Sequence, residues 1–101
     1  MNCLICLKVD HGAPHDMTRH VGDLGNIVTP VTGSTWIEIV DSFITLDESS
    51  ENSILDRALV IHADADDLGQ GGDAGSIATG NAGARLACGL IMEVMPCMYK
   101  H

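Results

Sequence analysis

Two long stretches without a helical or strand period constrain this chain of 101 residues most. Glycine and proline interrupt residues 11–26, and glycine and aspartate crowd residues 63–83. Loops of this length inside a compact domain are uncommon and are usually functional. The chain is short enough for one domain only, so its regular structure must come from short segments around these two stretches.

Short runs of aliphatic and β-branched residues lie between and beside the two stretches. They occupy residues 27–29, 35–40, 42–46, 58–62 and 85–92, with a hairpin turn at 31–34. Only 3% of the residues are aromatic, so aliphatic side chains must fill any core. The pattern predicts an all-β domain, a small sheet that carries two long loops.

The charge of the chain excludes several classes of partner. Fourteen acidic residues stand against five Lys and Arg, which gives a formal net charge of −9. Because phosphate backbones and anionic lipids repel such a chain, we expect neither nucleic-acid nor membrane binding. The first ten residues lack the basic stretch and the cleavage site of a signal peptide. A cytoplasmic location is therefore the default expectation, with an extracellular one kept open.

Four cysteines permit three full disulfide pairings, and the sequence does not choose among them. They are Cys3, Cys6, Cys88 and Cys97. The first two form a CxxC pair, but no second pair follows and no βαβ pattern surrounds it. We therefore interpret this CxxC as coincidental.

Histidine and aspartate gather in or beside the two loops. His11, His20 and Asp23 offer two imidazoles and a carboxylate, three of the four ligands of a tetrahedral zinc site. On spacing alone, solvated loop residues are the favoured interpretation. His62 ends an aliphatic run and precedes several aspartates, which suits a metal ligand or a capping histidine. Arg85 follows a glycine-rich turn, where it can hold a small anion or satisfy loop carbonyls.

Three ordered motifs resemble the copper-zinc superoxide dismutases. They read HGAP at 11–14 continuing as RHVGDLGN at 19–26, VIHADADDLG at 60–69, and GNAGARLACGLI at 80–91. The resemblance covers residues 11–91 as an incomplete domain and leaves 1–10 and 92–101 unmatched. It implies a partial Greek-key β-barrel or sandwich with two long metal-binding loops. The family usually forms homodimers.

The resemblance also implies a role for each matched metal-site residue. His11, His20 and Asp23 match zinc ligands. His62 matches one copper ligand. Asp66 matches a carboxylate that joins a zinc-binding histidine to a copper-binding one. Zinc and copper are therefore the cofactors that the resemblance implies.

The implied reaction converts superoxide to oxygen and hydrogen peroxide at copper. Arg85 matches the arginine that attracts and orients superoxide, and Cys88 matches half of an intrasubunit disulfide. Three of the four copper ligands belong to a portion of the family that has no counterpart here, so we expect weak or absent activity. The alternatives are a non-catalytic zinc-binding fragment and a subunit that completes its barrel with another chain.

Overall fold

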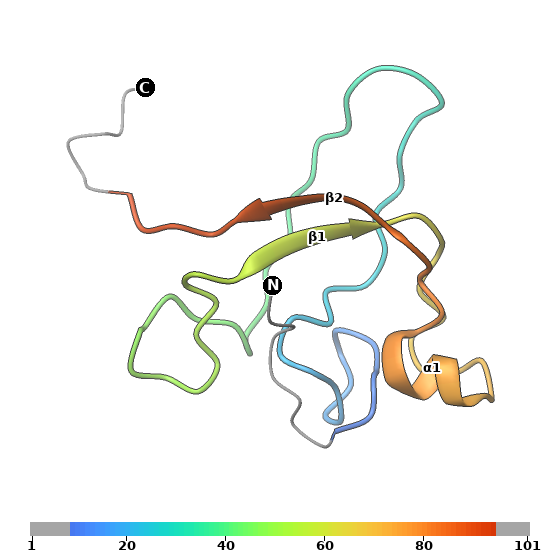
Figure 1. Ribbon diagram of the computed structural model, residues 1–101, viewed down its shortest axis with the longest axis horizontal. Coiled ribbons are helices and arrows are strands. Elements are labelled where there is room, and N and C mark those ends of the chain that lie inside the picture. Colours follow the sequence, from blue (N-terminus) through green and yellow to red (C-terminus); the bar gives the residue numbers. More distant parts are fainter. Residues whose placement is uncertain (1–8, 95–101) are drawn as a thin grey trace.

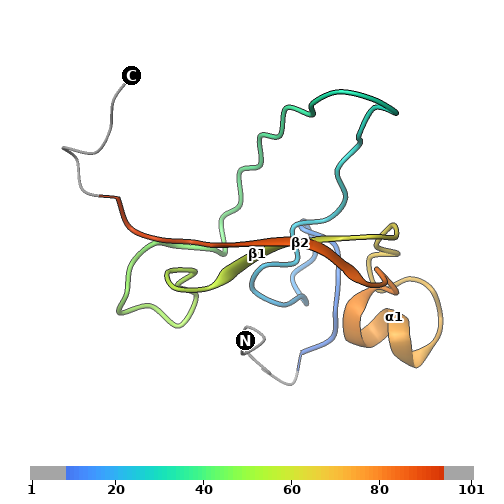
Figure 2. The same cartoon turned by 45° about the horizontal axis from the view of Figure 1, so that its top comes forward.

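The computed structural model describes residues 9–94. Its elements follow the order β1 (Ala58–His62), α1 (Ala74–Thr79) and β2 (Arg85–Leu90). The two strands form a two-stranded antiparallel sheet, and most of the remaining described chain is loop. Figures 1 and 2 both place α1 beyond the ends of the strands, close to the N-terminal loop. None of the described helices is long and apolar enough to cross a membrane.

The sheet forms where the sequence has its most continuous aliphatic runs. The strand expected at 58–62 is confirmed with the same bounds, and that expected at 85–92 is confirmed over Arg85–Leu90. Val60 pairs with Cys88, and the register shifts between Ile61 and His62. The shift sets His62 opposite Arg85, at the end of the sheet nearest α1.

The prediction that residues 63–83 have no regular structure is wrong, because the six-residue helix α1 lies inside this stretch. Asp73 caps its N-terminus by accepting a hydrogen bond from the Ser76 backbone N–H at 2.8 Å. Gly80 ends it in a left-handed conformation with φ of 68°. A helix of fewer than two turns shows too little of the 3.6-residue period to be found by pattern, and only its caps mark it.

The strands expected at 27–29, 35–40 and 42–46 do not form in the described structure. Residues 42–46 contribute one isolated parallel bridge, between Thr45 and Ser53. Figures 1 and 2 show the chain around residues 27–45 leaving the sheet as a wide loop, and the Trp36 side chain there is 90% exposed. An alternating pattern becomes a strand only when a neighbouring strand accepts its hydrogen bonds, and within residues 9–94 no strand pairs with this segment.

The buried residues gather around the two loops rather than on the sheet. Within residues 9–94, the buried apolar residues are Ala13, Val21 and Ala82, and the buried polar ones are His11, Arg19 and Ser76. Several aliphatic residues of β1 and β2 are instead exposed, including Leu59 and Leu86. The most tightly packed part of the structure is therefore a polar cluster centred on the loop that begins at His11.

Candidate metal site

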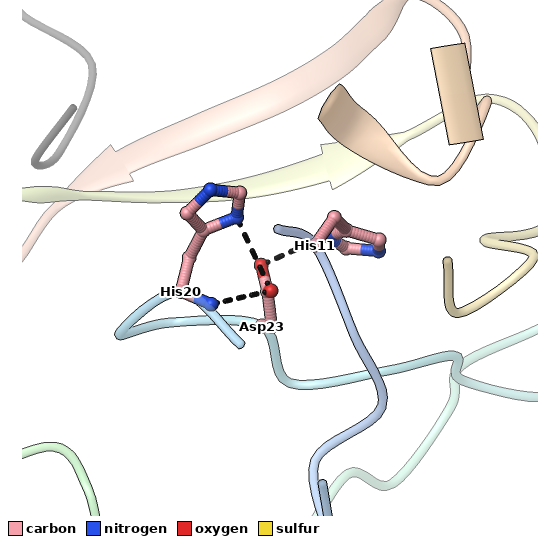
Figure 3. A group of neighbouring side chains, drawn as sticks. All are labelled: His11, His20 and Asp23. Carbon is pink, nitrogen blue, oxygen red and sulfur yellow. Dashed lines mark hydrogen bonds and ion pairs between the residues drawn. The ribbon is translucent and has the colours of Figure 1, made fainter. Parts of the chain in front are cut away.

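Three potential metal ligands converge in the N-terminal loop. His11, His20 and Asp23 each offer a ligand atom, and these atoms all lie within 4.8 Å of one another. Nδ1 of His11 is 3.0 Å from one Asp23 carboxylate oxygen, and Nδ1 of His20 is 3.3 Å from the other. Figure 3 shows the carboxylate between the two rings. Two zinc ligands at about 2.0 Å lie roughly 3.3 Å apart in a tetrahedron, so the donor spacing suits zinc.

The loop backbone fixes the direction of the Asp23 carboxylate. The backbone N–H groups of His20 and Gly12 both donate to its Oδ2, at 2.8 and 3.2 Å. The Asp23 N–H in turn donates to the His20 carbonyl at 3.2 Å, which closes a tight turn. The carboxylate therefore faces both imidazoles because of the local fold.

His11 is held from both sides. Its Nε2 lies 2.6 Å from Asp66 Oδ1, opposite the nitrogen that faces Asp23. Its backbone N–H donates to the Ile77 carbonyl of α1 at 2.8 Å. A carboxylate on the far nitrogen of a ligand histidine fixes the tautomer and orients the ring. With its proton on Nε2, His11 presents the lone pair of Nδ1 to the site.

The two carboxylates also change the proton affinity of His11. Burial alone disfavours the charged imidazolium, but the Asp66 hydrogen bond and the negative charges of Asp23 and Asp66 outweigh this. The net result is a pKa for His11 above its ordinary value of 6.5. In the metal-free protein a protonated His11 can thus bridge both carboxylates, and a metal ion would replace the proton on Nδ1.

We expect zinc binding to release this proton and to strengthen as the pH rises. A raised pKa means that protonated His11 stabilises the metal-free fold below pH 6.5, and that this stabilisation is lost as the pH rises through the folded-state pKa. Zinc affinity changes in the opposite sense, since the competing proton leaves. Calorimetric zinc titrations from about pH 6 to about pH 8, in buffers with different ionisation heats, measure both effects.

Asp66→Asn is the informative comparison for this pH dependence. It removes the negative charge beside Nε2, so the midpoint of the affinity increase should move to lower pH. His15→Ala serves as the control, because the His15 side chain is 82% exposed and lies outside the ligand group. A midpoint that Asp66→Asn leaves in place would contradict the role given to this carboxylate.

The structure does not bring His62 into a comparable group. His62 is exposed at the end of β1, and its Nδ1 lies 3.1 Å from the Gly83 carbonyl oxygen. Within residues 9–94, the one group of three or more possible ligands is that of His11, His20 and Asp23. Copper sites are built from several imidazole or sulfur donors. At His62 the described residues supply a single imidazole, which is too few donors for a copper site, whereas the group of His11, His20 and Asp23 suits zinc.

The other matched residues lie at separate places. Arg85 is exposed at the start of β2, opposite His62 in the strand register. Cys88 is exposed on the same strand. The other three cysteines, including the CxxC pair, and His101 lie outside the described residues.

Two contributors to the site escaped the sequence analysis. The Asn26 side chain donates to the Asp66 carbonyl at 2.9 Å and accepts from the Asp66 N–H at 2.8 Å. Arg19, beside His20 in the chain, donates through Nη1 to the Asp23 carbonyl at 2.9 Å. No local sequence pattern predicts either contact, because the tertiary fold determines which residues become partners.

Arg19 forms the most deeply buried ion pair of the described structure. Its Nη2 lies 2.7 Å from Asp41 Oδ2, and the two side chains are 1% and 3% exposed. Burial opposes ionisation of Asp41, but hydrogen bonds from Arg19 and from the Phe43 and Ile44 backbone overcome it and lower the pKa of the carboxyl. The Arg19 guanidinium also lies 4.1 Å from the Phe43 ring centroid. The pair anchors the metal-site loop to the segment around residue 41.

The sequence matches the model of the family described as copper/zinc superoxide dismutase over residues 5–91. It is 60% identical over 84 residues to an extracellular superoxide dismutase [Cu-Zn] of Haemonchus contortus, covering 83% of this chain and 45% of that protein. It is 55% identical over 84 residues to a superoxide dismutase [Cu-Zn] of Cryptococcus neoformans var. grubii, covering 83% and 53%. An extracellular superoxide dismutase [Cu-Zn] of Caenorhabditis elegans is 54% identical over 87 residues, covering 86% and 38%. The chain thus spans about half the length of these relatives.

Proposed function

The chain belongs to the copper/zinc superoxide dismutase family, and we propose that it is a zinc-binding portion of such an enzyme with little or no dismutase activity of its own. The observation that supports this proposal is the convergence of His11, His20 and Asp23, with Asp66 on the far nitrogen of His11. His11, His20 and Asp23 are also the zinc ligands that the family resemblance implies.

Each residue of the proposed zinc site has a separate task. His11 and His20 supply Nδ1 lone pairs, and Asp23 supplies a carboxylate oxygen between them. Asp66 keeps the His11 proton on Nε2, away from the site. Zinc has no redox chemistry, and a zinc ion bound here would act structurally by cross-linking distant positions of the N-terminal loop. This is the non-catalytic alternative, and the described donor set favours it.

The catalytic part of the proposal rests on His62 and Arg85. We assign His62 as a copper ligand and Arg85 as the residue that attracts the superoxide anion, and their opposition in the register at the end of the sheet supports the pairing. Copper, when bound, supplies the one-electron redox couple that dismutation requires. A single imidazole does not hold copper selectively, so activity of this chain alone should be weak or absent.

We also propose the barrel type, the oligomeric state and the location of this chain on the basis of the family resemblance. The exposed aliphatic residues on β1 and β2, such as Leu59 and Leu86, support the assignment of this sheet as part of a Greek-key β-barrel. A homodimer is the association that the resemblance implies. Two of the three relatives above are named extracellular, so their names lend no support to the cytoplasmic expectation over an extracellular one.

We expect metal-loaded chain to dismutate superoxide no faster than the same concentration of free copper. The reason is that His62 lies outside any described group of three donors. Pulse radiolysis after loading with zinc and copper measures the rate directly, and Arg85→Ala serves as the matched variant. A rate well above free copper that falls in Arg85→Ala would overturn the proposal of weak or absent activity.

A further inference from the structure

Gly80 occupies the space beside the hydrogen bond that orients His11. A Cβ built on Gly80 would lie 2.5 Å from His11 Nε2 and closer still to Asp66 Oδ1. Real Cβ atoms do not approach other heavy atoms so closely, so a side chain here requires one of the two partners to move. The absence of a side chain at this position thus permits the contact between imidazole and carboxylate.

Two hydrogen bonds restrain the backbone of Gly80 beside His11 and Asp66. Its N–H donates to the Ser76 carbonyl at 3.0 Å, which closes the last turn of α1. Its carbonyl accepts from the Asp67 N–H at 2.8 Å. Both polar groups of the residue are therefore engaged, one by the helix and one by the segment that carries Asp66.

Asp66 is equally restrained. Its Oδ1, the atom that faces His11, also accepts from the Leu68 N–H at 2.7 Å. Its backbone is bonded in both directions by the Asn26 side chain. Displacement of the His11 ring is therefore the expected response to a side chain at residue 80, and it would turn Nδ1 away from Asp23.

We propose that Gly80 is a positioning residue for the metal site: by leaving room for the His11–Asp66 hydrogen bond, it sets the tautomer and direction of the His11 ring that a metal ion requires. This inference rests on the proposed zinc site but concerns a residue outside the ligand set. It also makes the end of α1 one wall of that site, since α1 reaches His11 through Ile77 as well.

Gly72 provides a matched control for the substitution Gly80→Ala. Its φ is +80°, against +68° for Gly80, so both positions have the left-handed φ that disfavours alanine. A Cβ on Gly72 meets nothing within 4 Å, however. Gly72→Ala thus carries the backbone penalty alone, and any difference between the two variants reports on the space beside His11 and Asp66.

The experiment measures the His11 tautomer and zinc affinity in the full chain. Nitrogen-15 NMR of the metal-free protein at alkaline pH should show the proton on Nε2 in wild type and Gly72→Ala, and lose this signature in Gly80→Ala. Zinc affinity should fall about tenfold or more in Gly80→Ala relative to Gly72→Ala, as found when partners of metal ligands are lost. Equal affinities together with an unchanged tautomer would overturn the proposal.

A double-mutant cycle keeps the test valid if Gly80→Ala folds poorly. Removal of the Asp66 side chain takes away the nearest clashing atom but leaves the close approach to His11 Nε2, so in an Asp66→Ala background the two alanine substitutions should differ less in their effects on zinc affinity. A full difference that persists in that background would contradict the proposed route through Asp66. If wild type has the Nε2 tautomer yet binds no zinc, the proposed function fails while the positioning of His11 by Gly80 stands.

Discussion

Asp23→Ala should abolish stoichiometric zinc binding. Asp23 is one of the three converging donors, and it also accepts the backbone hydrogen bonds that hold the loop turn at His20 and Gly12. Its removal therefore deletes a ligand and loosens the other two at once. We expect a loss of about 100-fold or more in zinc affinity, at or beyond the upper end of the effect of losing a mere partner of a ligand. Competition against a chromophoric chelator measures the affinity.

Asp64→Ala is the matched control for Asp23→Ala. Asp64 is exposed in the same acidic protein, and it is not a member of the ligand group. Both variants remove one negative charge, so a general effect of net charge on cation binding would lower zinc affinity equally in the two. An equal loss in Asp64→Ala and Asp23→Ala would show that zinc binds to the acidic surface and not to the proposed site.

Arg19→Leu should cause the largest loss of folding stability among single substitutions of the loop. It leaves Asp41 buried without its cation and removes the hydrogen bond to the Asp23 carbonyl. Breaking a buried ion pair in this way costs about 3–5 kcal/mol. Total stabilities of small domains are about 5–15 kcal/mol, so the substitution should remove a large share of the free energy of unfolding. Urea unfolding followed by circular dichroism measures the change.

Two comparisons separate the ion pair from a general effect of losing an arginine. Arg85→Ala removes an exposed arginine and should change the free energy of unfolding little. The Arg19–Asp41 contribution should also disappear in acid: the Asp41 pKa is lowered by folding, so its stabilisation is present above pH 3.8 and is lost as the pH falls through the folded-state pKa. Arg19→Leu with wild-type stability would contradict the anchoring role of this pair.

The sequence predicted the parts of the fold that depend on contiguous residues. The run Ala58–His62 is aliphatic up to its last residue, and its strand has the predicted bounds. The strand at 35–40 was not found, because strand formation depends on a neighbour as well as on alternation. The helix α1 was missed for a different reason: its six residues carry almost no period, and its signals are the capping residues Asp73 and Gly80.

The candidate metal site could likewise be predicted from the sequence only in part. The residue types and order of His11, His20 and Asp23 pointed to zinc once the family resemblance was seen, and the structure brings their ligand atoms together. The supporting contacts could not be predicted from the sequence, since Arg19 and Asp41 are 22 positions apart and His11 and Asp66 are 55 apart. Pairings over such distances follow from how the loops pack around each other, which spacing along the chain does not encode.

X-ray absorption at the zinc edge of the loaded chain tests the central claim most directly. The account predicts one zinc ion per chain with only nitrogen and oxygen donors, at about 2.0–2.1 Å, and with the signature of more than one imidazole. A sulfur shell at about 2.3 Å would place the ion on cysteines instead. That result, or a chain that retains no stoichiometric zinc, would contradict the assignment of His11, His20 and Asp23 as the metal site.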